Sequence, residues 1–225
     1  MKRSEINQEI REALEFFKER KFKLPPWGYW SPEEWRQNIS SCDEIIHNQL
    51  GWDLTDFGSG SYSENGLLLF TLRNGNLHRD KKPYAEKIMV VNEDQLTPMH
   101  FHWTKMEDII NRGGGNLMIQ LYPSGPNEEM AEKDFTVKLD GINRSFSAGD
   151  VVRLRPGESI CLYPGLYHKF YGEPGKGKVL VGEVSAVNDD HVDNHFNPAV
   201  GRFPKIEEDE VPTHLLTMDY NSYGL

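Results

Sequence analysis

The stretch TPMHFHWTKMEDIINRGGG, residues 97–115, decides how the rest of the chain is interpreted. It places His100 and His102 one residue apart and Glu107 five positions later, before three glycines. In a helix, residues two apart point to nearly opposite sides, whereas in a strand they share one face. The surroundings are typical of strands, so we expect both imidazoles to point the same way. A turn or bulge at 103–106 would bring the carboxylate of Glu107 back to them.

A second segment supplies a third imidazole. In SICLYPGLYHKFY, residues 159–171, Pro164 and Gly165 favour a sharp turn, and His168 follows as the next strand begins. A neighbouring strand of an antiparallel barrel can aim His168 at the same interior point as the first pair. A lone histidine is usually an ordinary core or surface residue. Two on one strand face, with a carboxylate a short turn away, favour a metal site instead.

The composition restricts the class of protein. The chain of 225 residues can bury one substantial core, and its 37 % hydrophobic and 11 % aromatic content indicates a globular protein. A net charge of −10 argues against a nucleic-acid partner. No apolar run approaches the roughly 20 residues of a membrane span, and the first residues lack the apolar region of a secretory signal. Cys42 and Cys161 are far apart, so we expect no disulfide framework and a cytoplasmic location.

Residues 1–50 are predicted to form a helical N-terminal layer. Apolar residues recur at three- and four-residue intervals over 4–20, where Ser4 can cap a helix. A second helix is expected to begin at the capping box SPEE, residues 31–34, with proline at its first position. The aromatic residues of the connecting segment, residues 24–30, are expected to pack on the body of the domain.

Residues 51–200 are predicted to form a β-barrel, and residues 201–225 an acidic C-terminal extension along the surface. Turn signals such as Asn74-Gly75 and Asp140-Gly141 separate short apolar runs, which is typical of an antiparallel sandwich or barrel. The sequence therefore predicts one mainly β domain with N-terminal helices packed on it. The runs expected as strands are GLLLFTLRN, EKIMVVNE, NLMIQLY, DFTVKLD, VVRLRPG, SICLYPG, KFYGE and KVLVGEVSAV.

The expected ligands form an intermediate to hard set, because three imidazoles and one carboxylate come without a thiolate. Such a set suits Mn²⁺, Fe²⁺, Ni²⁺, Co²⁺ or Zn²⁺. Four protein ligands on an octahedral metal leave two positions open. That is room for a vicinal diol or a hydroxy-carbonyl unit, with the metal acting as a Lewis acid.

Other polar residues lie where a site would use them. Glu183 interrupts the apolar run KVLVGEVSAV, where a buried carboxylate makes a natural general base, unless it faces outward. Lys105 lies between the histidine pair and Glu107 and would stabilise an oxyanion, or else be a solvated lysine in a turn. Gln120 is either a sugar-hydroxyl contact or an outward-facing residue. Asp189 and its neighbours form either a hydroxyl-binding loop at the barrel mouth or a solvated turn.

The pattern HxHx4Ex6G, followed some fifty residues later by PGxxH, resembles the two motifs of the cupin superfamily. In cupins these motifs supply three histidines and one glutamate to a divalent metal inside a small β-barrel. The resemblance implies a cupin fold, a jelly-roll type of antiparallel barrel. It also implies that the metal ligands are His100, His102, Glu107 and His168.

Over nearly its whole length the sequence resembles the D-lyxose isomerases, which are cupin-type aldose–ketose isomerases. The likeness rests on MKRSEINQEIREALEFFKERKFKLPPWGYW at the start, on the metal motif, and on GEVSAVNDDHVDNHF and GRFPKIEEDEVPTHLL near the end. It implies interconversion of D-lyxose and D-xylulose, commonly with D-mannose and D-fructose as further substrates. It also implies a homodimer and Mn²⁺ as the preferred metal, with Co²⁺, Ni²⁺ or Zn²⁺ as substitutes.

On this hypothesis, Glu183 moves a proton between C2 and C1 of the sugar through a metal-bound cis-enediol, and Lys105 stabilises the enediolate. Asp189, Asp193 and Arg202 are further candidates for proton relay or hydroxyl contacts. A metal-driven hydride shift is the rival mechanism.

Three other functions remain open on the sequence alone. The first is a cupin dioxygenase that uses Fe²⁺, and the second is a sugar-binding cupin without catalytic activity. The third, a sugar-phosphate isomerase, needs several basic residues around the phosphate, which the acidic balance of the chain disfavours.

Overall fold

Strands dominate the computed structural model, which describes residues 1–79, 81–189 and 192–224. The strands of these residues form two sheets, one of eight in the order β1-β2-β3-β12-β5-β10-β7-β8 and one of five in the order β13-β4-β11-β6-β9. All neighbouring strands pair antiparallel, which confirms the mainly β prediction. The strands are β1 Gly51–Thr55, β2 Leu67–Arg73, β3 Tyr84–Val91, β4 Thr97–Phe101, β5 Glu107–Gly114, β6 Leu117–Pro123, β7 Phe135–Leu139, β8 Ile142–Phe146, β9 Val151–Leu154, β10 Ser159–Leu162, β11 Leu166–Gly172, β12 Val179–Ala186 and β13 His195–Phe196.

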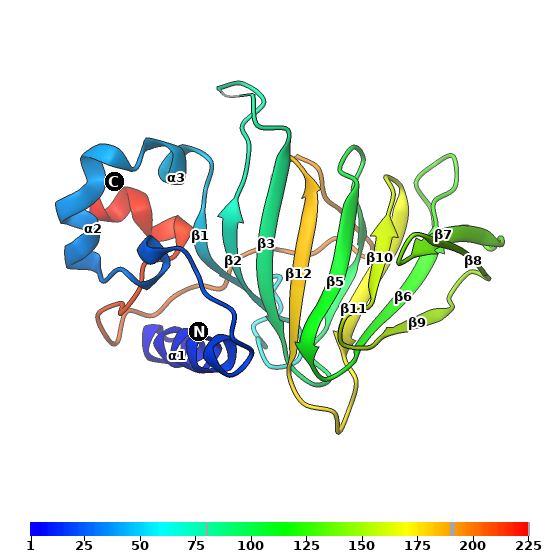
Figure 1. The fold of residues 1–225 in the computed structure, drawn as a ribbon, viewed down its shortest axis with the longest axis horizontal. Coiled ribbons are helices and arrows are strands. Elements are labelled where there is room, and N and C mark those ends of the chain that lie inside the picture. Colours follow the sequence, from blue (N-terminus) through cyan, green and yellow to red (C-terminus); the bar gives the residue numbers. More distant parts are fainter. Residues whose placement is uncertain (80, 190–191, 225) are drawn as a thin grey trace.

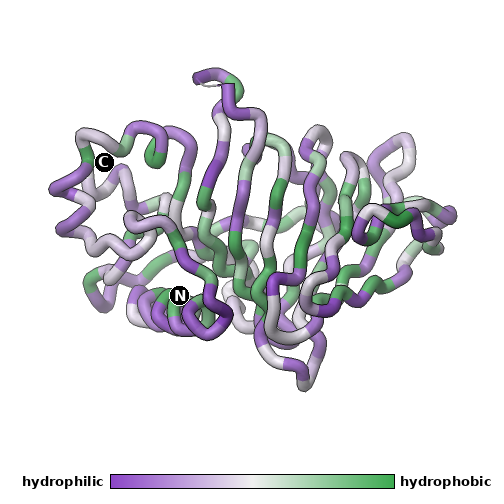
Figure 2. Tube along the Cα trace, in the orientation of Figure 1, coloured by the Kyte–Doolittle hydropathy of each residue, from purple (hydrophilic) through white to green (hydrophobic). Residues whose placement is uncertain are grey.

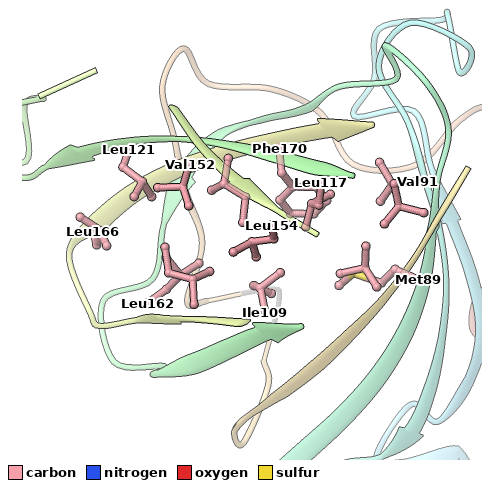
Figure 3. Packing of buried hydrophobic residues seen from close by; sticks show 14 of the residues in the cluster. Met89, Val91, Ile109, Leu117, Leu121, Val152, Leu154, Leu162, Leu166 and Phe170 are labelled. Atoms are coloured by element: carbon pink, nitrogen blue, oxygen red, sulfur yellow. The ribbon is translucent and has the colours of Figure 1, made fainter. Parts of the chain in front are cut away.

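The main core lies between the two sheets. Successive side chains of a strand point to opposite faces, so every second residue of β6 faces inward. Leu117, Ile119 and Leu121 of this strand are fully buried against Leu154 of β9 and Leu162 of β10. Figure 3 shows Leu117, Leu121, Leu154 and Leu162 gathered in the interior between strands. Hydrophobic residues lie mostly along the strands, and the connecting loops are mainly hydrophilic (Figure 2).

The helices gather beside β1 at one end of the large sheet, far from β7 and β8 (Figure 1). They are α1 Arg3–Glu19, α2 Pro32–Asn38 and α3 Asp43–His47, and none of the helices in the described residues is long and apolar enough to cross a membrane. Helix α1 packs its apolar face on the outer side of the sheet, where Ile6 and Ile10 join Phe70 of β2.

The predicted helix start is right for α2, whereas the cap of α1 lies two residues before the predicted one. Ser31 caps α2 and completes the expected capping box with Glu34. The residue that caps α1 is Lys2, not Ser4, and the Lys2 backbone N–H donates to the Glu5 carboxylate. Ser4 lies inside the helix, and its hydroxyl donates to Asp209 in the C-terminal segment.

The prediction that the C-terminal extension lies along the surface is wrong for a short part of it, near its end. Leu216 and Tyr220 are buried, and the Tyr220 hydroxyl donates to a backbone carbonyl. The Arg3 guanidinium of α1 donates to both Glu208 and Asp219. The acidic residues that suggested a solvated tail therefore include partners of a buried arginine, and the segment holds α1 in place.

The link between β4 and β5 is the feature of the fold that positions the site. The expected turn at 103–106 exists, but it carries the chain from the five-stranded sheet to the eight-stranded sheet. The sequence reading did not identify β5 as a strand. The histidine pair His100 and His102 and the carboxylate of Glu107 consequently face each other across the interior. The division into layers at residues 50 and 200 stays a prediction.

Candidate metal centre and cavity

Three histidines converge inside the barrel. His100 on β4 lies directly opposite His168 on β11 in the strand pairing, and their ring centroids are 4.1 Å apart. His102 follows the end of β4. All three side chains are buried, and one ring nitrogen from each lies within 4.8 Å of the others. The sequence prediction that the three imidazoles meet is confirmed.

Each of these rings is held by its Nδ1 atom. The acceptors are the backbone carbonyl oxygens of Pro98 for His100, Asp193 for His102 and Leu166 for His168, at 2.8, 2.8 and 3.0 Å. A hydrogen bond at Nδ1 leaves Nε2 as the atom that can bind a metal. Within the described residues, the buried Nε2 of His168 forms no hydrogen bond of acceptable geometry, although the Glu107 carboxylate lies nearby, and this leaves the atom available to an ion.

Glu107 approaches the histidines from the opposite sheet. Its Oε1 lies 3.5 Å from Nε2 of His102 and 3.2 Å from Nε2 of His168. Burial alone would raise the pKa of the Glu107 carboxyl, but Lys105 and His102 hold this pKa well below its usual value. Burial, with His168 and His102 nearby, lowers the pKa of His100 well below its usual value. Neutral imidazole and ionised carboxylate are the forms that bind a divalent cation, so the donor set fits one.

Asp193 fixes the segment between the two sheets. Its carboxylate accepts the backbone N–H groups of Thr104 at 2.9 Å and Lys105 at 2.8 Å, and its carbonyl accepts from His102. The side chain is buried and does not line the cavity. The predicted relay or sugar contact for Asp193 does not fit this placement, because the carboxylate is occupied in holding the loop.

A lysine and a second glutamate lie beside the metal centre. The Lys105 ammonium is 2.7 Å from Oε2 of Glu107 and 3.0 Å from Oε1 of Glu183, and it also donates to Asn188 at 3.1 Å. Lys105 and Glu183 are buried, so the readings of a solvated lysine and an outward-facing glutamate are wrong. The hydroxyl of Ser185 donates to Oε1 of Glu183 at 3.1 Å.

The site opens into a cavity of about 330 Å³. Its lining includes the three histidines, Lys105, Glu107 and Glu183, together with apolar side chains such as Met89, Phe170 and Phe196. The volume suits a small molecule with a polar end.

The remaining predicted site residues are divided between the cavity and the outside. Arg202 lines the cavity. Gln120 does not, because alternation along β6 turns it away from the core, and its amide donates to the Gly149 carbonyl at 2.9 Å. Asp189 lines a separate surface pocket. The sugar contacts predicted for Gln120 and Asp189 do not agree with these positions.

Sequence reasoning missed other residues that line the cavity. Lys87 on β3 is buried there, and Asp53 and Thr55 reach it from β1. Lys87 carries the same signal that identified Glu183, a charge inside an apolar strand, in the run EKIMVVNE. The short strand β1 has no comparable signal.

Comparisons with known proteins show the family of the chain. A family model described as D-lyxose isomerase matches residues 1–220. The chain is 49 % identical over 226 residues to the D-lyxose/D-mannose isomerase of Escherichia coli O157:H7, covering 99 % of this chain and 100 % of that protein. It is 49 % identical over 223 residues to the protein of the same name from Serratia proteamaculans, covering 98 % of each.

A solved structure shares the fold. The L-ribose isomerase of Cellulomonas parahominis aligns with a TM-score of 0.62 at 16 % identity, covering 92 % of this chain and 98 % of that chain. At this identity the likeness concerns the fold alone, and it agrees with the predicted mainly β fold with N-terminal helices.

Proposed function

The chain belongs to the D-lyxose isomerase family and is a sugar isomerase, and on that premise we propose that it interconverts D-lyxose and D-xylulose. D-Mannose and D-fructose are proposed as further substrates, in line with the names of the two relatives at 49 % identity. The observation that carries the proposal is the buried Lys105–Glu183 pair beside three converging histidines in one cavity.

The proposed cofactor is a divalent metal, with Mn²⁺ as the preferred ion. His100, His102, His168 and Glu107 would hold it, and the orphaned Nε2 of His168 supports this assignment. When bound, such an ion supplies Lewis acidity to neighbouring sugar oxygens. Mn²⁺, a homodimer and a cytoplasmic location are supported here only by the resemblance and the composition, and all three stay predictions.

Glu183 is the proposed proton shuttle. In an aldose, its carboxylate would take the proton from C2 and return it to C1, while a proton moves from O2 to O1. The intermediate is a cis-enediol, in which a double bond joins C1 and C2 and each of these carbons carries a hydroxyl group. Glu183 lines the cavity beside the histidines. Lys105 and Ser185 donate hydrogen bonds to its Oε1 at 3.0 and 3.1 Å. A carboxylate held in this way is pre-oriented for transfer between adjacent carbons.

Lys105 is proposed to stabilise the negative charge that develops on the sugar oxygen. Its ammonium lies between the carboxylates of Glu107 and Glu183, so it is within reach of both the metal centre and the proton shuttle. A buried cation stabilises a nearby oxyanion more strongly than an exposed one does, because the local dielectric constant is low.

An assay of ketose formation tests the proposal. Metal-stripped protein is reloaded with Mn²⁺, Co²⁺, Ni²⁺, Zn²⁺ or Fe²⁺ and given D-lyxose, D-mannose and their phosphorylated counterparts. We expect ketose from the free sugars, fastest with Mn²⁺. Oxygen consumption with Fe²⁺ and no ketose would instead indicate a dioxygenase, and saturable sugar binding without turnover would indicate a binding protein.

The proton-transfer step has a separate test. Turnover in D₂O should place deuterium at C1 of the ketose, because Glu183 exchanges its proton with solvent. Complete absence of solvent deuterium would favour a hydride shift and remove Glu183 from this role.

A further inference from the structure

The donors of Lys105 are fully committed. A lysine ammonium has three N–H groups, and the described residues place at least three acceptors around this one. They are Oε2 of Glu107 at 2.7 Å, Oε1 of Glu183 at 3.0 Å and Oδ1 of Asn188 at 3.1 Å. The proposed function requires Lys105 to donate to a sugar oxyanion as well. One of these three contacts must therefore break during the reaction.

Two of the three contacts are poorly suited to break. The contact with Glu107 is the shortest, and that carboxylate belongs to the proposed metal centre. Asn188 is fixed by Asn74, which accepts its backbone N–H at 2.9 Å and donates to its carbonyl at 2.8 Å. The contact with Glu183 is the one that remains. Since Glu183 is only 4 % exposed, loss of its cationic partner would leave a buried charge uncompensated, at a considerable energetic cost.

A second ammonium is already in place to compensate. Lys87 of β3 lies directly opposite Glu183 of β12 in the strand pairing, and both side chains face the cavity. Its Nζ is 3.7 Å from Oε1 of Glu183, the same oxygen that Lys105 contacts. Lys87 is 5 % exposed within an apolar strand, where a charge is costly unless it is paired.

We propose that Lys87 is a positioning residue that keeps the Glu183 carboxylate paired and oriented while Lys105 turns to the substrate. This inference rests on the proposed function. Lys105 and Lys87 both lie beside Oε1 of Glu183, so the departure of Lys105 leaves one cation still beside that carboxylate. Lys87 thus acts through Glu183 and late in the reaction, not on initial sugar binding.

The test compares Lys87→Met and Lys87→Arg with wild type, all loaded with Mn²⁺. We expect Lys87→Met to lower kcat roughly 10- to 100-fold, the cost of a misplaced catalytic group, and to change KM by less than about 3-fold. Lys87→Arg retains the charge and should keep more of kcat. The affinity for D-arabitol, the alditol of D-lyxose, should be unchanged, because an alditol has no carbonyl and reports ground-state binding only. Lys169→Met, on β11, is the matched control for loss of a strand lysine that does not line the cavity.

A rescue experiment guards against a folding defect. Lys87→Ala should recover activity several-fold on addition of propylammonium, which replaces the deleted atoms, while wild type does not respond. An unchanged kcat in Lys87→Met, loss of the metal, or no rescue of a folded Lys87→Ala would overturn the inference. So would a rise in KM and in the D-arabitol Kd that accounts for the whole loss in kcat/KM. A wild-type protein that forms no ketose would overturn the proposed function as well, whereas an unaffected Lys87→Met in an active enzyme overturns this inference alone.

Discussion

The interior of the barrel has a charged half and an apolar half, and the same strands build both. Along the inner face of β12, Val179 and Val181 belong to the apolar core, and Glu183 reaches the site. The neighbouring strand β3 repeats this change, with Met89 in the core and Lys87 beside Glu183. Strand alternation alone puts all of these residues inside. Which half they belong to depends only on the type of residue at each inward position.

The two halves differ in what holds them together. In the apolar half, side chains fill space, and Figure 3 shows them in contact across the barrel. In the charged half, each group depends on a specific partner, such as Lys105 on Glu107 and Glu183. We therefore expect substitutions in the charged half to change chemistry and those in the apolar half to change stability.

His168→Ala should give the largest effect, loss of metal retention and of all metal-dependent activity. The substitution removes one of three converging imidazoles, whose Nε2 is the orphaned atom of the site. Metal content after gel filtration and turnover with added Mn²⁺ measure the result. His47→Ala, which alters a histidine on α3, is the control. Normal metal content in folded His168→Ala would remove His168 from the ligand set.

Glu183→Gln should keep the metal and lose about 10³-fold in kcat, within the usual range for a general base. Glutamine nearly matches glutamate in shape but cannot accept the C2 proton as a carboxylate does. Glu86→Gln, on the outer face of β3, is the matched control outside the cavity. Activity of Glu183→Gln near that of wild type would exclude Glu183 as the shuttle.

The charged half could be partly predicted from the sequence, because the period of a strand is two. That period puts His100 and His102 on one face, and the apolar neighbours of Glu183 indicate its burial. The same reasoning did not decide between the two alternatives for Gln120, which lies on the outward-facing side of β6. An isolated polar residue does not reveal which phase of its strand it occupies.

Apart from the meeting of the three histidines, which a family resemblance and strand pairing suggested, the contacts between distant segments were beyond prediction. Asp193 binds the backbone of the loop after β4 across 88 residues of sequence, and no local pattern announces this. The burial of Leu216 likewise depends on where the C-terminal segment meets β1, at the Trp52–Leu216 bridge. Local periodicity determines faces and elements, whereas these contacts depend on how the elements assemble.

Leu117→Ala tests the apolar half. Leu117 is fully buried in β6, so its truncation should lower the free energy of unfolding by about 2–5 kcal/mol, through lost burial and a residual cavity. Urea denaturation of metal-stripped protein measures the change. The kcat of the folded, Mn²⁺-loaded enzyme should be unaltered. Ile142→Ala, at a side chain 55 % exposed, should cost less than about 0.5 kcal/mol. A large loss of kcat in Leu117→Ala would show that the two halves are not independent.

Lowering the pH should change the free energy of unfolding contributed by the charged half but not that contributed by the apolar half. This effect is expected to be smaller than the preceding ones. In metal-stripped protein the pKa of Glu107 lies well below its ordinary value of 4.5, because Lys105 and His102 outweigh the opposing effect of burial. A carboxyl whose folded-state pKa is depressed stabilises the fold above the unfolded-state pKa. That contribution is lost as the pH falls below about 4.5 toward the folded-state value. Wild type should therefore be more stable than Glu107→Gln at pH 7, and the gap in free energy of unfolding should narrow at pH 4. The gap between wild type and Leu117→Ala should be the same at both pH values, because no titrating group is removed. A Glu107→Gln gap that stays constant or widens in acid would mean that the ionised carboxylate does not stabilise the charged half.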